Sequence, residues 1–375
     1  MNGALRIGVM NDMSSVYSDF QGPGSVVAAQ LAAEDFAKQS KRKVEILSAD
    51  HQNKPDVGAS IARRWFDVDG VDMIIDVPNS AVALGVADIA REKNKVLIGS
   101  GAGSSLLTGA KCSPNTVHWT YDTWAMGHGV ARGVLAQGGK SWFFITADYA
   151  FGQDLEKQAS EEVKKEGGQV LGSVRHPLGA ADFSSFLLQA QASGAQVLGL
   201  ANAGADFTNS VKAANEFGIT KTMKPAGLDA YITDIHSLGL QTAQGLFLTA
   251  SWYWDLNDDA RAFAKRYFEK MHKEPTMNQA AYYSATLTYL KAVKAAGTSD
   301  ADKVMAELRR TKINDMFTQG GYIRADGVMI HDMYVMQVKT PQESKYPWDY
   351  YKVVKKMSGE EAFGPITGLC PLAPK

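Results

Sequence analysis

Leu5-Arg6-Ile7-Gly8-Val9-Met10 is a short, mostly apolar run, and such a run is typical of a buried strand. A segment with apolar side chains near helical spacing follows at residues 24–39. The alternation of the two patterns continues as strand 44–49, helix 56–66, strand 71–77, helix 81–93 and strand 96–98. Strand–helix–strand units of this length predict a parallel sheet that helices cover on both faces.

A second series of the same kind follows a break. Residues 111–123 contain Pro114 and Asn115 and show no clear helical period. The pattern then resumes as helix 124–137, strand 142–146, helix 153–166, strand 169–174, helix 183–193, strand 197–201 and helix 205–217. Strand segments begin about every 27 residues, which suits one strand, one helix and two turns. The sequence therefore predicts an α/β fold with two successive doubly wound units.

The last third of the chain has a different order of elements. A strand is expected near 245–249, and late strands are expected at 320–323 and 332–338. Between them lie three predicted helices without intervening strands, at 258–272, 278–296 and 301–310, and the tail 346–375 has no strong period. No low-complexity linker separates the halves, so we expect short connections between the domains.

Composition limits the classes of function. The chain has 375 residues, which suggests two domains. Lysine and arginine number 39 against 40 acidic residues, so no overall positive field is available for nucleic acid or an anionic membrane. The longest apolar runs fall well short of the ~20 residues of a membrane span. Two cysteines permit either one disulfide or two free thiols.

Motifs of common enzyme classes are not found. The glycine-rich run 99–105 would need glycine at position 104 for a dinucleotide fingerprint, and Ser104 stands there. The sequence contains no H-E-x-x-H, C-x-x-C or G-x-S-x-G pattern. We therefore expect no cofactor, no metal and no catalytic activity, although a triad of distant residues has no local signature. The run 99–105 fits either a simple tight turn or a set of backbone donors for a carboxylate.

Ligands of doubly wound sheets bind outside the carboxyl ends of the strands. In the first unit, this edge carries hydroxyls, aromatic rings and backbone donors. In the second unit, it carries aromatic rings, an amide and one carboxylate. The candidate ligand-binding residues are Tyr17, Phe20, Asn79, Ser80, Ser100, Ala102, Gly103, Ser104, Tyr149, Phe151, Asn202 and Asp229. For each aromatic residue, packing in the core or at a hinge is the alternative.

The order and spacing of several short segments resemble a known family. The segments are the first strand with Met13-Ser14, then 22–30, 50–55, 77–80, 100–102, 147–152 and 182–184. With them, essentially the whole chain resembles the type I periplasmic solute-binding proteins of ABC importers, in the group of the Leu/Ile/Val-binding proteins. The resemblance implies two α/β lobes joined by three crossovers, with the ligand cleft between them and hinge closure on the ligand. Lobe 1 would be 1–121 plus 254–331, lobe 2 would be 122–253 plus 332–360, and 361–375 would return to lobe 1.

The resemblance also assigns roles at the ligand site. Ser80 matches the hydroxyl that meets a ligand carboxylate, and Ala102 and Gly103 match the adjacent backbone donors. The acidic residue that holds a ligand ammonium aligns nearest Leu228, one position before Asp229. Either Asp229 takes that role, or the ligand lacks an ammonium. An amino acid and an aromatic acid both remain candidates.

Further expectations follow from the resemblance. Cys112 and Cys370 are expected to form a disulfide that joins the tail to lobe 1, which implies export. The sequence starts without a signal peptide, so the alternatives are a cytoplasmic protein and a mature periplasmic one. A monomer that delivers a small carboxylate solute to an inner-membrane ABC permease is the leading hypothesis. A cytoplasmic ligand sensor of the same fold and an α/β enzyme are the rivals.

Overall fold

The computed structural model describes residues 3–372, so the ends of the predicted lobe 1 and tail, residues 1–2 and 373–375, lie outside the described residues. The chain forms two compact units. Unit 1 comprises 1–121, 252–332 and 364–375, and unit 2 comprises 122–251 and 333–363. The chain thus passes from one unit to the other after Tyr121, Ser251, Asp332 and Phe363. Within the described part of the chain, no helix combines the length and the apolar character that crossing a membrane requires.

Unit 1 is built on a five-stranded sheet in which every pair of neighbours is parallel. The strand order is β2-β1-β3-β4-β5. The bounds are β1 Leu5–Asn11, β2 Val44–Asp50, β3 Met73–Asp76, β4 Val96–Gly99 and β5 Thr116–His118. Gly8 in β1 accommodates a large neighbour, because a Cβ there would lie 2.4 Å from ring carbons of Trp65. The parallel order confirms the fold class predicted for the first unit.

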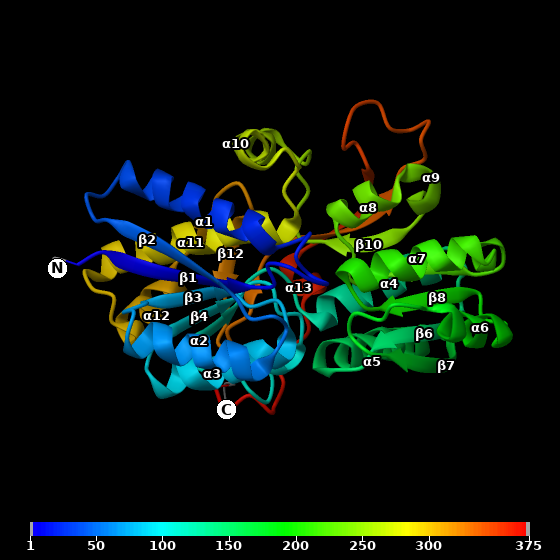
Figure 1. Cartoon of the computed structure of the whole chain (residues 1–375), viewed down its shortest axis with the longest axis horizontal. Coiled ribbons are helices and arrows are strands. Elements are labelled where there is room, and N and C mark those ends of the chain that lie inside the picture. The colour runs from blue at the N-terminus through cyan, green and yellow to red at the C-terminus, as the bar shows by residue number, and fades with distance from the viewer. Residues whose placement is uncertain (1–2, 373–375) are drawn as a thin grey trace. The chain divides into compact units, whose positions relative to one another are not determined.

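Helices cover both faces of this sheet (Figure 1). Helices α1 (Gly22–Ala37) and α11 (Met277–Ala296) pack on each other over one face, and α2 (Pro55–Asp67) and α3 (Ser80–Glu92) lie on the other. The rest of unit 1 consists of η1 Ser105–Leu107, α10 Asp258–Met271, α12 Ala301–Arg310 and a small sheet of β11 Ile313–Asn314, β12 Gln319–Ile323 and β13 Met329–Ile330. The apolar core between the sheet and α2 and α3 includes Trp65, Ile74 and Val86.

Unit 2 contains a seven-stranded sheet with the order β15-β14-β10-β9-β8-β6-β7. Strands β10, β9, β8, β6 and β7 are parallel, whereas β14 pairs antiparallel with β10 and β15 pairs antiparallel with β14. The bounds are β6 Ser141–Ala147, β7 Gln169–His176, β8 Val197–Ala201, β9 Lys224–Gly227, β10 Phe247–Ala250, β14 Met333–Val338 and β15 Tyr351–Met357. Its helices are α4 Thr123–Ala136, α5 Ala150–Lys165, α6 Ser184–Ala192, α7 Gly204–Glu216, η2 Ile219–Lys221, α8 Ile232–Leu238, α9 Leu240–Ala243 and α13 Gly359–Ala362.

Some elements differ from the prediction. The tail 346–375, in which no strong period was found, contains β15, and residues 111–123, in which no clear helical period was found, contain β5. Strand β15 lacks the continuous apolar run of the predicted strands because it lies at the edge of the sheet. It carries exposed valines and lysines, and Val353 is 50% exposed. The α8 and β9 elements were also not predicted. The bounds of the other predicted helices and strands agree with the observed ones to within a few residues. Differences of this size are usual at the ends of helices.

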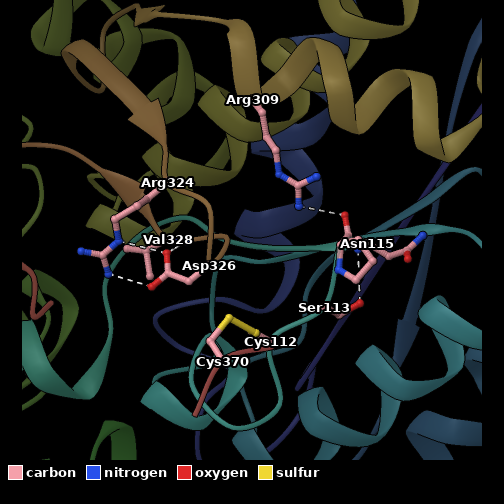
Figure 2. Close-up of a disulfide and its surroundings, with 9 residues drawn as sticks. Cys112, Ser113, Asn115, Arg309, Arg324, Asp326, Val328 and Cys370 are labelled. Carbon is pink, nitrogen blue, oxygen red and sulfur yellow. Dashed lines mark hydrogen bonds and ion pairs between the residues drawn. A yellow bond between two sulfur atoms is a disulfide. The ribbon is translucent and has the colours of Figure 1, made fainter. Parts of the chain in front are cut away.

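A disulfide closes unit 1 and confirms the predicted pairing. Cys112 and Cys370 are bonded, with their Cα atoms 5.5 Å apart (Figure 2). A hydrogen bond also holds the segment that leads to Cys370. Arg324 pairs with Asp326 and donates from Nη1 to the carbonyl of Gly364 at 2.7 Å, so the returning tail is fixed by a polar contact as well as by the covalent bond.

Candidate functional site

The loop after β1 carries two of the predicted aromatic residues, Tyr17 and Phe20. Both are 2% exposed, and their ring centroids lie 5.5 Å apart. Asp12 organises the loop, because its carboxylate accepts hydrogen bonds from the backbone N–H groups of Ser15 and Tyr17, each at 2.8 Å. Burial acts to raise the pKa of Asp12, but these donors and the Asn53 amide outweigh it and lower the pKa. An ionised Asp12 therefore holds the backbone of the loop at Ser15 and Tyr17.

Asn79 and Ser80 lie where β3 passes into α3. Asn79 is the N-cap, and its Oδ1 accepts from the N–H groups of Ala81 and Val82. Ser80 is the first residue of the helix and is 1% exposed. Its Oγ accepts a hydrogen bond of 3.1 Å from the backbone N–H of Ser104. The structure thus brings Ser80 to the glycine-rich turn after β4, as the sequence predicts for neighbouring strand ends.

The glycine-rich turn is held by its carbonyl groups. Thr120 Oγ1 donates to the carbonyl of Ser100 at 2.5 Å, and Tyr121 OH donates to that of Gly101 at 3.0 Å. The carbonyl of Ala102 lies 2.5 Å from His118 Nε2. Between residues 3 and 372, no oxygen accepts a hydrogen bond from the backbone N–H of Ala102 or of Gly103. A turn whose acceptors are engaged and whose donors are not is suited to bind a carboxylate.

A buried polar cluster surrounds Gly101. A Cβ on this glycine would lie 2.6 Å from Gln21 Nε2, 2.7 Å from Asp76 Oδ1 and 2.9 Å from Tyr282 OH. Asp76 is fully buried, and burial raises its pKa to about 7. Its Oδ2 accepts from Asn11 Nδ2 at 3.0 Å. The cluster leaves no room for a side chain, so only glycine fits in this turn.

The candidate residues of unit 2 follow its strands. Tyr149 is half-buried and is the N-cap of α5, and Phe151 in the first turn is 4% exposed. Their ring centroids are 5.9 Å apart. The two side chains form an aromatic pair at the carboxyl end of β6, which can contact the apolar body of a ligand.

Asn202 and Asp229 lie at adjacent strand ends, because Leu200 and Gly227 are paired in the sheet and each candidate lies two residues beyond its member of this pair. Asn202 Nδ2 contacts His176 Nε2 and Ser210 Oγ, both at 3.1 Å, and its Oδ1 has no protein partner in the described chain. Asp229 is 2% exposed, and its Oδ1 also lacks a described partner. Burial raises the pKa of Asp229 to about 7. Each of these two neighbouring strand ends thus carries a buried oxygen that lacks a described partner.

Each predicted site residue therefore lies at a carboxyl strand edge of its own unit, and its role in binding stays a prediction. Sequence reasoning missed the groups that hold the site in place, among them Asp12, Asp76, His118 and Thr120. A carboxylate at the carboxyl end of an apolar strand, as at Asp12 and Asp76, is a signal that could have indicated these two residues. Across residues 3–372, no group of three or more His, Cys, Asp and Glu side chains is arranged to hold a metal ion.

Comparison with known proteins agrees with this architecture. A periplasmic binding protein of Burkholderia mallei has 55% sequence identity and a TM-score of 0.96, with 98% of this chain and 99% of that chain covered. A branched chain amino acid ABC transporter periplasmic ligand-binding protein of Burkholderia xenovorans LB400 has 43% identity and a TM-score of 0.85, covering 97% and 99%.

A curated relative matches over a shorter stretch. The Leu/Ile/Val-binding protein homolog 6 of Brucella abortus is 27% identical over 195 residues, which is 51% of this chain and 49% of the relative. The match thus spans about half the length of that relative. A family model described as "Periplasmic binding protein" matches residues 4–345, which is most of the chain. The chain therefore belongs to the periplasmic binding protein family.

Proposed function

We propose that this protein binds a small carboxylate-bearing solute outside the cytoplasm and delivers it to an ABC permease. The observation that carries the proposal is the pair of backbone donors at Ala102 and Gly103, next to the Ser80 hydroxyl. A carboxylate has two oxygens that accept such bonds, and hydrogen bonds to an ionised group are the stronger kind. The name of the Burkholderia xenovorans relative supports an amino acid transporter as the context.

Asp229 supports an amino acid as the solute. A buried carboxylate whose Oδ1 lacks a protein partner is costly when ionised, and an incoming ammonium would supply both charge and hydrogen bonds. The neighbouring Asn202 Oδ1 offers a second acceptor. We propose that Asn202 and Asp229 bind the ammonium of an amino acid.

An aromatic acid is the second candidate for the solute. The rings of Tyr17, Phe20, Tyr149 and Phe151 favour a flat apolar body, because offset or edge contacts between aromatic rings add to the gain from burial. A protonated Asp229 could then donate a hydrogen bond to a phenolic oxygen, since its pKa of about 7 leaves much of it neutral near neutrality.

Matched ligands distinguish the two candidates. We would titrate leucine, 4-methylpentanoate and 3-methylbutylamine, which share a branched apolar body but carry both charged groups, only the carboxylate or only the ammonium. Phenylalanine, 3-phenylpropanoate and 4-hydroxybenzoate form the aromatic series. Thermal shift identifies binders and calorimetry gives Kd, because a ligand of the folded state raises its stability. The proposal would be contradicted if none of the carboxylate solutes bound to the protein.

Binding without chemistry is part of the proposal. When a stabilising solute is incubated with the protein, the NMR spectrum of the solute should show no new product. Conversion of the solute into a product would favour an enzyme. Osmotic-shock fractionation of the native cells tests the periplasmic location, and recovery with the cytoplasm would favour the ligand sensor. We expect a monomer, which light scattering of the purified protein checks.

A further inference from the structure

Two hollows lie in unit 1 at the end of the sheet opposite to the candidate ligand residues. The first, of about 570 Å³, lies between α1 and the edge strand β2, and the second, of about 560 Å³, lies between the start of β1, α1 and α11. Residues 40–43 line both hollows. Strand β1 spans seven residues, so this end lies about 20 Å from its carboxyl end.

Each hollow combines apolar walls with a cationic rim. Ala33 and Ile46 contribute to the first, and Phe36 and Val293 contribute to the second. The common rim is the consecutive run Lys41, Arg42 and Lys43, and Lys294 of α11 joins it at the second hollow. Both volumes fall within the range of about 300–1,000 Å³ that is usual for sites of small molecules.

Two carboxylates near this rim are already paired with basic side chains, one of them with Lys43 of the rim itself. Glu34 reaches the first hollow, but its Oε1 accepts from Lys270 Nζ at 3.0 Å. Glu45 is shared between Arg6 and Lys43, each at 2.8 Å. Among the described residues, no carboxylate forms an ion pair with Lys41 or with Lys294.

The rim is also held in position. Lys294 Nζ donates to the carbonyl of Gln39 at 2.6 Å, and the backbone N–H of Leu5 donates to the carbonyl of Lys43 at 2.8 Å. The backbone N–H of Arg42 donates to Ser40 Oγ at 3.2 Å. The positive charges are therefore presented on a segment that is tied to both β1 and α11. Concave surfaces of one sign of charge concentrate counter-ions.

We propose that these hollows bind a soluble phosphate monoester with an apolar body. A doubly charged phosphate with three acceptor oxygens matches several cations better than a single carboxylate does, and arginine and lysine are the side chains that proteins use for phosphate. The apolar walls would contact the organic part of the ester. The site is separate from the proposed solute site and does not rest on it.

Phenyl phosphate is the probe, and inorganic phosphate and phenol are its two halves. Calorimetry at low ionic strength should show saturable binding of phenyl phosphate, weaker binding of each half, and a loss of affinity in added salt. The double variant Lys41→Gln/Arg42→Gln should bind phenyl phosphate at least tenfold more weakly. The control Lys212→Gln/Lys221→Gln removes two exposed lysines of unit 2 and should bind it like the parent.

Residue-level protection provides a second measurement. Phenyl phosphate should slow acetylation of Lys41 and Lys294 by acetic anhydride, read by mass spectrometry, without slowing that of Lys212. Ser80→Ala should leave both readouts unchanged, which separates this site from the proposed solute site. The proposal would be overturned if Lys41→Gln/Arg42→Gln and the control Lys212→Gln/Lys221→Gln lost affinity for phenyl phosphate equally. It would also be overturned if phenyl phosphate did not protect Lys41 from acetylation. Binding only to vesicles that contain phosphatidylglycerol, and not to phenyl phosphate, would overturn it in favour of a membrane surface.

Discussion

The backbone N–H of Ser104 donates a hydrogen bond of 3.1 Å to Oγ of Ser80, which lies 24 residues earlier in the chain. The bond joins the first turn of α3 to the turn after β4. Because the Oγ already accepts from the protein, its own proton is available to be donated. The hydroxyl is therefore suited to donate to a ligand acceptor such as a carboxylate.

Replacement of Ser80 tests this arrangement. Ser80→Ala should weaken carboxylate solutes by about tenfold to a hundredfold, because a hydrogen bond to a charged group is lost. Thermal unfolding should change little, since only the single bond from Ser104 is removed. Ser48→Ala, at an exposed serine of β2, is the control and should bind like the parent. Equal affinities of the parent and Ser80→Ala for every carboxylate solute would count against this pocket.

Asp229 gives solute binding a distinctive pH dependence. Its pKa of about 7 in the free protein should fall when an ammonium binds, because the opposite charge stabilises the ionised form. Affinity for an amino acid should therefore rise from pH 5.5 to 8, and binding at pH 6 should release a proton. Calorimetry in two buffers of different ionisation enthalpy measures that release.

Two controls sharpen this prediction. Asp229→Asn should bind amino acids more weakly and with little pH dependence. A solute that lacks an ammonium should release no proton on binding to the parent. Affinity for amino acids that falls between pH 6 and 8 would contradict the assigned role of Asp229.

Asp76 should make the fold less stable at higher pH. Burial raises its pKa to about 7 in the folded state, above the value of about 3.9 expected in the unfolded chain. The folded state therefore binds the proton more tightly, so this contribution to stability is complete below pH 4 and is lost as the pH rises through 7. The loss is on the order of a few kcal/mol.

Asp76→Asn separates Asp76 from the other raised carboxyl groups. We would measure the free energy of unfolding by urea at pH 5 and at pH 8. Its fall between these two pH values should be larger in the parent than in Asp76→Asn. Asparagine keeps the acceptor for Asn11 and tolerates the φ of 90° at this position. Glu216→Gln, at an exposed residue, should behave like the parent. Identical pH dependence in Asp76→Asn and the parent would contradict the prediction.

Gly101 should not tolerate alanine. The new Cβ would lie within 3.0 Å of polar atoms of Gln21, Asp76 and Tyr282, all of them buried. The free energy of unfolding of Gly101→Ala, measured by chemical denaturation, should be about 1–3 kcal/mol lower than that of the parent. Solute binding should also weaken. Gly85→Ala is the matched control, because a Cβ there meets nothing within 4 Å and the residue is helical. That variant should be as stable as the parent or about 1 kcal/mol more stable.

Removal of the disulfide should destabilise the protein. The Cys112→Ser/Cys370→Ser variant loses a cross-link between residues separated by 258 positions, and its free energy of unfolding should fall by about 2–5 kcal/mol. A reducing agent should lower the melting temperature of the parent toward that of the variant and leave the variant unchanged. An unaltered melting curve of the reduced parent would show that the bond contributes little.

The apolar strands and amphipathic helices were predictable because each carries its signal locally. Strand β8 and helix α12 have the predicted bounds, since their patterns of apolar residues are complete. Strand β9 was missed because it is four residues long and contains Pro225. Strand β15 was missed because an edge strand needs no continuous apolar face.

The candidate site was predictable only in part. Strand ends identify residues such as Ser80 and Asp229, because their place in the sheet follows from the order of strands and helices. The contacts of Gly101 were not predictable, since Gln21, Asp76 and Tyr282 reach it from segments far apart in the chain. Local patterns report the edge of a sheet, whereas the environment of a buried group depends on tertiary packing.

The bond between Cys112 and Cys370 makes most of the chain one covalent ring. All of unit 2 lies within that ring, together with residues 252–332 of unit 1. A single backbone cut between the two cysteines opens the ring but releases no fragment. A protease that nicks the protein once in this region therefore leaves its mass on a non-reducing gel unchanged, and the pieces separate only after reduction.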